Sequence, residues 1–254
     1  LMQNLLEKSH YIKANPRFEW PTWLEKRPYE IAEFMRTQRR QLVSMSGKVQ
    51  LVVGGPPCQG FSFAGKRTGK DQRNELFKHH LKVVNILHPE MVLMENVQGI
   101  ETVFGAGKKS RRKRPGRPRK SYASRIHDAL EKRGYKVQQH VLKATHFGVP
   151  QYRPRYFTLG IRKDLLLGMD EPNLQEVLEK IRNNFLKHRR LPVRRLVTVG
   201  DAISDLTADG KKLVECVDEE SPPGFKEIVY KGPKTRYQKL MHAGMNGRAP
   251  NSLR

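Results

Sequence analysis

Short apolar runs alternate with amphipathic segments along the first half of the chain. Two of these runs, at 49–53 and 91–94, have the length and composition of buried strands. Between them lies a helical stripe that Pro89 ends, formed by Leu76, Phe77, Leu81, Val84 and Leu87. Two buried strands joined by a helix predict a parallel βαβ unit, whose ligands would lie beyond the carboxyl ends of the strands.

Two polar or reactive positions follow these predicted strands. The first run ends in a Gly-Gly-Pro-Pro segment at 54–57 that neither a helix nor a strand can continue, so we expect Cys58 in a stiff loop after a buried strand. Glu95 and Asn96 come at the end of the second run. The carboxyl ends of parallel strands share one edge of a sheet, so this fold would bring Cys58 and Glu95 together.

The flanking segments add further elements. A surface helix is expected from Tyr29 to about Val43, and another helix at 122–130, with Gly134 at its C-terminal end. Strands are expected at 135–141 and 156–161, separated by only about a dozen residues. That distance leaves no room for a crossover helix, so these two strands should pair antiparallel.

The periodicity weakens in the second half of the chain. Residues 174–185 have helical character, and 197–206 are expected to form a short structured segment. We place a domain boundary near Arg190, with residues 1–190 in one domain and 191–254 at the start of a second.

Charge favours a polyanionic partner. The chain has 49 Lys and Arg against 25 Asp and Glu, a formal net charge of +24, and nucleic acid is the first candidate. A membrane surface is the alternative, but no apolar run approaches the roughly 20 residues that span a bilayer, and no signal peptide is recognisable. We therefore expect no membrane contact and an intracellular protein, cytoplasmic near the nucleoid in a prokaryote or nuclear in a eukaryote.

Cysteine usage points to one reactive thiol. Only Cys58 and Cys216 occur, without C-x-x-C spacing, which argues against a zinc ribbon and a disulfide framework. A cysteine taken at random is more often a small core residue than a nucleophile. The loop around Cys58 favours the nucleophile, because prolines stiffen it, glycines permit close approach, and the basic surroundings favour the thiolate.

Two other patterns do not support a function. The segment 104–109 lacks the first glycine and the Ser or Thr of a phosphate-binding loop. His79 and His80 are adjacent on a helix and point apart, without a suitably spaced carboxylate, so we expect a helix-surface position and no metal.

Four motifs together carry a family resemblance. They are GGPPCQGFSFAG at 54–65, DQRNELF at 71–77, ENVQG at 95–99 and GVPQYRPR at 148–155. In this order they resemble the DNA (cytosine-5) methyltransferase family, strongly over 49–163 and weakly over 197–206. The resemblance implies an α/β, Rossmann-like methyltransferase fold with a mostly parallel sheet ending in an antiparallel hairpin, followed by the start of a smaller target-recognition domain.

The resemblance also implies an activity, namely methyl transfer from S-adenosylmethionine to carbon 5 of a flipped-out cytosine in double-stranded DNA. Carbon 5 is too poor a nucleophile until a thiolate adds at carbon 6, which is the role implied for Cys58. Glu95 would contact ring nitrogen 3 and the amino group. Arg153 and Arg155 would lie in the same pocket and hold the base oxygen, a flanking phosphate or the loop.

Further contacts are implied by the same motifs. The expected substrate-binding residues are Gln59, Gly60, Ser62, Asn96 and Gln151. For Asn96 and Gln151, a turn-capping amide is an equally good interpretation. Pro57 is expected to contact S-adenosylmethionine, and the enzyme is expected to act as a monomer.

A basic insert at 105–121 interrupts the catalytic region. Its Pro-Gly-Arg-Pro-Arg core resembles an AT-hook, in which Arg114, Arg117 and Arg119 would enter the minor groove of A·T-rich DNA, although Pro115 replaces the usual arginine. A solvated basic segment and a nuclear-localisation signal are the alternatives. Without its nine basic residues the chain is still at +15, so attraction to DNA does not depend on the insert.

No Phe-x-Gly-x-Gly pattern precedes residue 49, so we expect a partial catalytic domain that lacks the cofactor loop and binds S-adenosylmethionine weakly. Two rival functions stay open: a catalytically silent DNA-binding relative and a cytosine-5 RNA methyltransferase. Intact Cys58 and Glu95 weigh against the first, and Gly60-Phe61-Ser62 resembles the DNA enzymes more than the RNA enzymes. The target sequence, the host and any restriction partner cannot be read from this chain.

Overall fold

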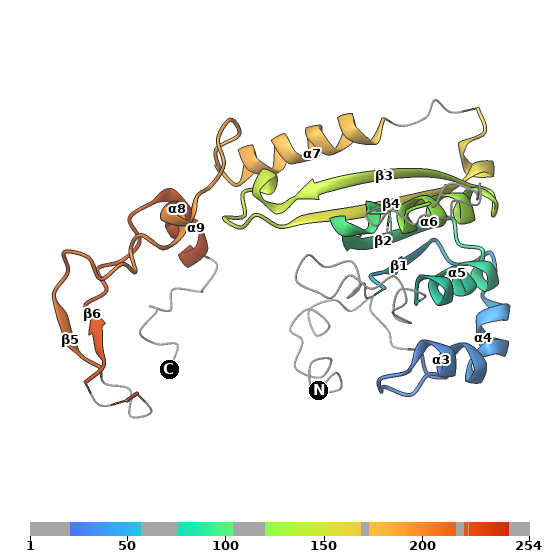
Figure 1. The fold of residues 1–254 in the computed structure, drawn as a ribbon, viewed down its shortest axis with the longest axis horizontal. Coiled ribbons are helices and arrows are strands. Elements are labelled where there is room, and N and C mark those ends of the chain that lie inside the picture. The colour runs from blue at the N-terminus through green and yellow to red at the C-terminus, as the bar shows by residue number, and fades with distance from the viewer. Residues whose placement is uncertain are drawn as a thin grey trace, which may run out of the picture.

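The computed structural model describes residues 21–56, 76–103, 120–168, 173–216, 221–222 and 224–243. At its centre lies a four-stranded sheet of order β1-β2-β4-β3, built from β1 (Leu51–Gly54), β2 (Met91–Val97), β3 (Tyr135–Lys143) and β4 (Pro154–Arg162) (Figure 1). β1 and β2 pair parallel, whereas β4 pairs antiparallel with both β2 and β3. Three of these strands therefore run in one direction, and the predicted α/β Rossmann-like fold with its antiparallel hairpin is confirmed.

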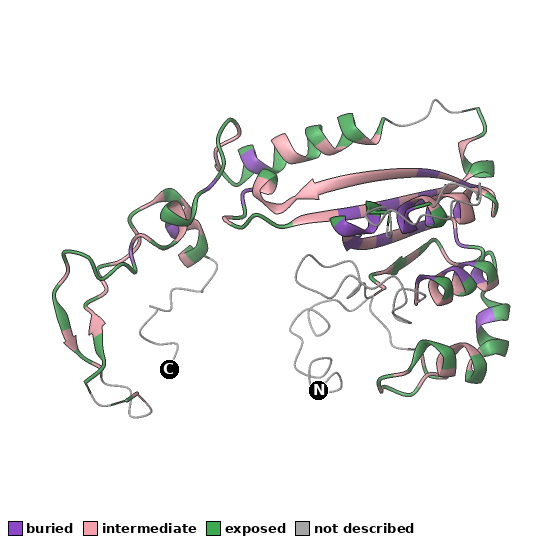
Figure 2. Ribbon diagram, in the orientation of Figure 1, coloured by how far each residue is buried: buried purple, intermediate pink, exposed green. Residues whose placement is uncertain are grey.

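Two helices cover one face of this sheet. α5 (Leu76–Leu87) and α6 (Tyr122–Glu131) present the apolar stripes expected from their spacing, and both contribute to the main hydrophobic core with β2, β3 and β4. Figure 2 shows the buried residues concentrated on these helices and on the strands behind them. β2 alternates strictly, with Val92, Met94 and Asn96 buried, so the residues between them point to the opposite face.

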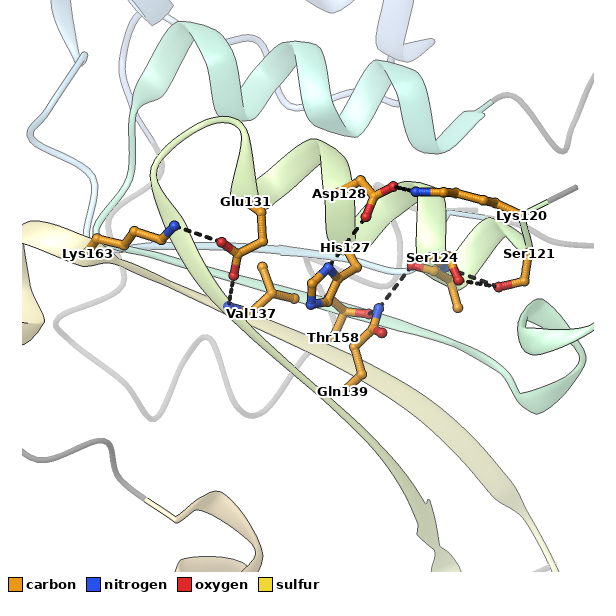
Figure 3. Close-up of polar contacts among 11 residues, drawn as sticks. Lys120, Ser121, Ser124, His127, Asp128, Glu131, Val137, Gln139, Thr158 and Lys163 are labelled. Carbon is orange, nitrogen blue, oxygen red and sulfur yellow. Dashed lines mark hydrogen bonds and ion pairs between the residues drawn. The ribbon is translucent and has the colours of Figure 1, made fainter. Parts of the chain in front are cut away.

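Polar contacts fix α6 to the sheet (Figure 3). Gln139 on β3 donates from Nε2 to the Ala123 carbonyl at 3.1 Å and to Thr158 Oγ1 at 3.2 Å. At the other end of α6, Glu131 accepts from the Val137 backbone N–H at 3.2 Å and pairs with Lys163 at 2.7 Å. These bonds set the position of α6 along the strands while the apolar stripe supplies the burial.

Two expectations about the N-terminal part are corrected. The single helix expected at 29–43 is two, α3 (Ile31–Thr37) and α4 (Arg39–Ser44), because the chain leaves helical geometry at Gln38. The strand expected to be buried is partly exposed, with Leu51 at 44% and Val53 at 63%. Within the described sheet β1 is an edge strand with β2 as its one neighbour, so its side chains are covered less than those of β2.

The remaining elements lie beyond the sheet or connect its strands. Short 3-10 turns connect or follow the strands: η2 (Gln98–Glu101), η3 (Ala144–Phe147) and η4 (Lys163–Leu166). α7 (Leu174–His188) packs against η3, and after it come α8 (Val199–Ile203), the hairpin β5 (Leu213–Glu215) and β6 (Lys226–Ile228), and α9 (Arg236–Ala243). Figure 1 shows α8 and α9 beyond the end of the sheet toward which β3 points.

Membrane-spanning helices and metal-binding clusters are both absent from the described residues. None of the helices in that part of the chain is both long and apolar enough to cross a bilayer. The same residues contain no group of three or more His, Cys, Asp or Glu side chains placed to hold a metal ion.

Candidate active site

Glu95 projects from β2 on the face of the sheet opposite α5 and α6. It lies between the buried positions Met94 and Asn96, and its side chain is 41% exposed. The strand is longer than the sequence predicted and continues to Val97, so Glu95 belongs to a paired strand and not to a loop. The carboxylate therefore starts from a rigid backbone position.

An ion pair across the sheet fixes this carboxylate. Arg155 Nε lies 2.9 Å from Glu95 Oε1, and Arg155 is opposite Val97 in the antiparallel β2–β4 ladder. The guanidinium also donates from Nη1 to the Pro154 carbonyl at 2.8 Å. Because the Arg155 side chain is only 23% exposed, the pair is partly shielded from solvent, and it positions Glu95 more than it stabilises the fold.

Asn96 links this strand to the end of β1. Its side chain is buried, with Nδ2 donating to the Pro56 carbonyl at 3.2 Å and Oδ1 accepting from the Val97 N–H at 2.9 Å. A Cβ atom built on Gly55 would lie 3.3 Å from Glu95 Oε2, so the Gly55 backbone is in contact range of the carboxylate. The chain leading to Cys58 thus runs directly past Glu95.

An apolar cavity of about 370 Å³ adjoins the same end of β1. Among the described residues it is lined by apolar side chains of α3, β1 and α5, with His80 as the one titratable side chain of that described lining. A Cβ atom on Gly54 would come within 2.3 Å of His80 Nδ1, so the glycine allows the ring to pack against the strand end. Burial lowers the pKa of His80, and its Nε2 has no hydrogen-bond partner within the described residues.

This arrangement corrects the position expected for His80. The sequence pattern predicted that both histidines lie on the helix surface, whereas the His80 ring lies inward against Gly54. Helical spacing carried a signal for this packing, because His80 follows Phe77 by three residues and falls beside the buried stripe of α5. His79 is likewise partly buried, and among the described residues its Nδ1 has no hydrogen-bond partner.

The loop between β3 and β4 carries the remaining described site residues. Gln151 and Arg153 are exposed, and neither side chain makes a hydrogen bond or ion pair within the part of the chain that the structure describes. The Arg153 carbonyl accepts from the Ala144 N–H at 3.2 Å, which closes the base of the loop. Of the two expected arginines, the structure therefore brings Arg155 to Glu95 and leaves Arg153 exposed to solvent.

Several expected site residues lie outside the described ranges. These are the nucleophile loop residues Pro57, Cys58, Gln59, Gly60 and Ser62, and the insert residues Arg114, Arg117 and Arg119. Their roles stay predictions. What the structure describes is the framework around the loop: its start at Gly55 and Pro56, and the Glu95–Arg155 pair beside it.

Comparison with known proteins gives a consistent match. The family model for C-5 cytosine-specific DNA methylases matches residues 25–240. The Type II methyltransferase M.AgeI of Thalassovita gelatinovora is 32% identical over 209 residues, covering 80% of this chain and 43% of the relative. M1.HphI of Haemophilus parahaemolyticus is 44% identical over 120 residues, covering 46% and 28%.

A third relative is matched over more of its own length. M.AquIA of Picosynechococcus sp. is 37% identical over 161 residues, which cover 63% of this chain and 61% of the relative. In all three alignments the chain spans less than two thirds of the relative.

Proposed function

The chain belongs to the C-5 cytosine-specific DNA methylase family, and we propose that it methylates carbon 5 of cytosine in double-stranded DNA through a covalent Cys58 adduct. One observation carries this proposal. Asn96 holds the Pro56 carbonyl at 3.2 Å, so the backbone two residues before Cys58 is tethered beside the Glu95–Arg155 pair. A nucleophile and a carboxyl group at one sheet end match what addition to a cytosine ring requires.

The proposed first step is addition of the Cys58 thiolate to carbon 6. A sulfur–carbon bond forms while the electron pair of the carbon 5–carbon 6 double bond moves toward carbon 5 and the nitrogen 3 side of the ring. Glu95, positioned by Arg155, takes part in its protonated form: one carboxyl oxygen donates its proton to nitrogen 3 as charge builds up there, and the other accepts a hydrogen bond from the amino group. After methylation a base takes the carbon 5 proton, and the electrons of that carbon–hydrogen bond re-form the carbon 5–carbon 6 double bond. The sulfur–carbon bond breaks with its electrons on sulfur, which releases the thiolate, and nitrogen 3 returns its proton to Glu95.

The two arginines receive different roles in this proposal. Arg155 is a positioning residue, because its guanidinium is already engaged with Glu95 and the Pro154 carbonyl. Arg153 is exposed and has no side-chain partner within the described residues, so its guanidinium is available to a phosphate or to the base oxygen. Gln151 has the same exposure and is proposed to face the DNA.

Extrusion of the cytosine is a necessary part of this chemistry, since carbon 6 is inaccessible inside a stacked duplex. Flipping costs a few kcal/mol, which contacts to the DNA backbone must offset. The +24 net charge of the chain supports such contacts. By the same resemblance, the residues in the nucleophile loop and in the basic insert are proposed to contact DNA, the insert through the minor groove.

S-adenosylmethionine is the proposed methyl donor, which supplies an electrophilic methyl group. The described residues provide only part of a site for it. The cavity beside Gly54 and Pro56 offers an apolar wall suited to a ring, but its described lining contains no carboxylate for ribose hydroxyls. Pro57 is proposed to contact the donor, as the family resemblance implies.

Two domains are proposed on the same basis. Residues 1–190 form a catalytic domain that is partial with respect to the cofactor loop, and 191–254 begin a target-recognition domain. Contacts across this boundary exist: Arg182 of α7 donates from Nη2 to the Val193 carbonyl at 3.0 Å. The enzyme is proposed to be intracellular and monomeric, and to act in a restriction-modification system; M.AgeI, one of its relatives, is named a Type II methyltransferase.

A trapping experiment tests the proposal. Duplex DNA containing 5-fluorocytosine should form a stable covalent complex with the protein in the presence of S-adenosylmethionine, because fluorine cannot leave carbon 5 as a proton does. The complex should be absent for Cys58→Ala and reduced at least about a hundredfold in rate for Glu95→Gln, in line with the loss of general acid catalysis.

Two outcomes would contradict the proposal. DNA binding by the wild type without any adduct would favour the catalytically silent DNA-binding relative. Adduct formation with a 5-fluorocytosine RNA but not with the DNA duplex would favour the RNA methyltransferase.

A further inference from the structure

A second cavity, of about 290 Å³, lies between the segment that follows α7 and the helices α8 and α9. Three arginines from three separate positions line it: Arg190 after α7, Arg195 before α8, and Arg236 at the start of α9. Asp201 is the one acidic residue in the described lining. The cavity is therefore strongly basic, and no step of the proposed chemistry uses it.

The acidic residue is already neutralised. Asp201 accepts two hydrogen bonds from Arg195, at 2.7 and 3.2 Å, and it caps α8 by accepting from the Thr198 N–H at 2.9 Å. The Arg195 guanidinium and the Thr198 N–H lower the pKa of Asp201 well below its usual range. Arg195 and Asp201 thus form a structural pair and leave the other two arginines without a counter-charge among the described residues.

Arg190 and Arg236 have the properties of anion ligands. Both are exposed at the cavity, and neither guanidinium has a hydrogen bond or ion pair within the described ranges. The first turn of α9 adds the positive end of a helix dipole on the same side. One of its N-terminal N–H groups is already used, since the Gln238 N–H donates to Thr235 Oγ1 at 3.1 Å, so the arginines supply the main attraction.

The cavity wall is connected to the loop that carries Arg153. Arg190 adopts φ +53°, a rare conformation for a residue other than glycine, and the turn it forms places Leu191 against Gly148. A Cβ on Gly148 would lie 2.7 Å from Leu191 Cδ1, so this packing is close. Arg182 completes the connection by donating to the carbonyls of His146 at 2.8 Å and Val193 at 3.0 Å.

We propose that this arginine cavity binds a phosphate of the DNA backbone and positions the duplex relative to the Arg153 loop. The inference rests on the proposed function, because that function supplies the polyanion. Two guanidiniums without counter-charge in the described structure suit one phosphate, whose oxygens accept charge-assisted hydrogen bonds. Residues of α8 and α9 contribute to the cavity lining, and these helices lie beyond the sheet end toward which β3 points (Figure 1). Arg155 of the candidate active site is opposite Leu142, near that same end of β3.

Arg190→Gln and Arg236→Gln test this proposal, with Arg189→Gln as the matched control. Arg189 is likewise an exposed arginine, next to Arg190, and it does not line the cavity. The dissociation constant for a fluorescent duplex is measured from about 50 to about 300 mM KCl. Each cavity variant should weaken binding about tenfold and lower the slope of log K against log salt by about 1, whereas Arg189→Gln should change binding less than about twofold.

Two further measurements separate the loss of a phosphate contact from damage to the catalytic site or to the fold. At saturating DNA both cavity variants should form the 5-fluorocytosine adduct to the wild-type level, since neither arginine touches the base. Arg236→Lys should recover part of the affinity because it keeps the charge. Arg236 lies on the exposed first turn of α9, so its replacement tests the cavity even if the strained turn at Arg190 does not tolerate glutamine.

The outcomes distinguish failure of this inference from failure of the proposed function. If the wild type binds and traps DNA but the cavity variants bind as tightly, or no more weakly than Arg189→Gln, the inference fails and the function stands. If inorganic phosphate raises the wild-type Tm but not that of the variants, while DNA affinity is unchanged, the cavity takes free anions and the DNA assignment is wrong. If the wild type neither binds nor traps DNA, both fail.

Discussion

At the scale of single residues, the candidate site depends on glycines at the end of β1. Gly54 allows the His80 ring to pack where any side chain would collide with it, and Gly55 allows the backbone to approach Glu95 Oε2. Both contacts are short because the first atom of a side chain is missing. The Gly-Gly-Pro-Pro motif that marks the start of the loop in the sequence thus also lets the side chains of His80 and Glu95 approach the loop backbone.

The buried His80 predicts a pH dependence of stability. Burial lowers the pKa of His80 below its ordinary value of 6.5, so the unfolded chain binds a proton more readily than the folded one. The stability due to neutral His80 is fully present above about pH 6.5 and is lost as the pH falls through the folded-state pKa, at up to about 1.4 kcal/mol per pH unit. Urea unfolding of the wild type and of His80→Phe between about pH 5 and pH 8 measures this.

The difference between these two proteins reports on His80 because the other described side chains that line the cavity carry no titratable group. His80→Phe should show a flatter loss of unfolding free energy between about pH 6.5 and about pH 5 than the wild type. Equal slopes for the two proteins would show that His80 is not the residue that titrates.

At the scale of elements, the site is an edge where three segments are held together by few bonds. β2 provides Glu95 and Asn96, β4 provides Arg155, and the end of β1 is attached through the Pro56 carbonyl. The strand ladders are rigid, and the hydrogen bond from Asn96 to the Pro56 carbonyl links the start of the loop to β2. Substitution of Asn96 therefore tests how far this link positions the nucleophile loop.

Asn96→Ala should reduce adduct formation more than stability. The substitution removes the donor to Pro56 and leaves the Val97 N–H without the acceptor on Asn96, at a cost of about 1–3 kcal/mol. The rate of 5-fluorocytosine trapping should fall at least about tenfold because the loop loses its tether. Quenched trapping reactions and urea unfolding measure the two effects separately.

Gln139→Ala is the matched control for this prediction. Gln139 is likewise a side-chain amide that bridges two partners, the Ala123 carbonyl and Thr158 Oγ1, but it acts on the α6 side of the sheet (Figure 3). It should lose similar stability and keep the wild-type trapping rate. A similar fall in rate for both variants would mean that general destabilisation, and not the loop tether, explains the effect of Asn96→Ala.

At the scale of the whole molecule, the described residues supply more of the groups proposed to act on DNA than of those needed to bind the methyl donor. The Glu95–Arg155 pair proposed to act on cytosine is assembled, and a basic cavity on the α8 and α9 side is available to DNA. By contrast, β1 is an exposed edge, and the cavity beside it is apolar, with no acidic side chain in its described lining. The described residues thus include basic groups suited to DNA but no acidic group beside the apolar cavity that could bind the ribose of the methyl donor.

Residues 1–254 by themselves should bind S-adenosylmethionine weakly, with a dissociation constant of at least about 1 mM. An apolar cavity without a ribose-binding carboxylate in its described lining can contribute little more than the burial of one ring, and about −4 kcal/mol corresponds to a millimolar constant. Isothermal titration calorimetry tests this, with DNA binding by the same sample as a control for folding. A micromolar constant would show that the missing polar groups are provided elsewhere in the chain.

The sequence alone determined the local elements and which residues are candidates for the chemistry. The helical stripes of α5 and α6 and the antiparallel pairing of β3 with β4 follow from spacing and residue type, whereas Glu95 and Arg155 were singled out by motifs that resemble a known family. Periodicity is local, so it reports which face of an element is apolar and where a turn must fall. It also explains why the single helix expected at 29–43 was wrong, because one apolar stripe does not reveal a break at Gln38.

Only the tertiary structure decided which elements become neighbours. β4 inserts between β2 and β3, which brings Arg155 to 2.9 Å from Glu95 although 60 positions (155 minus 95) separate them in the chain. The inward position of His80 and the meeting of Arg190 with Arg236 arise in the same way. Strand order and cavity lining depend on which distant surfaces pack best. The free energy of this packing depends on both segments of each contacting pair, so the pattern of one segment cannot predict it.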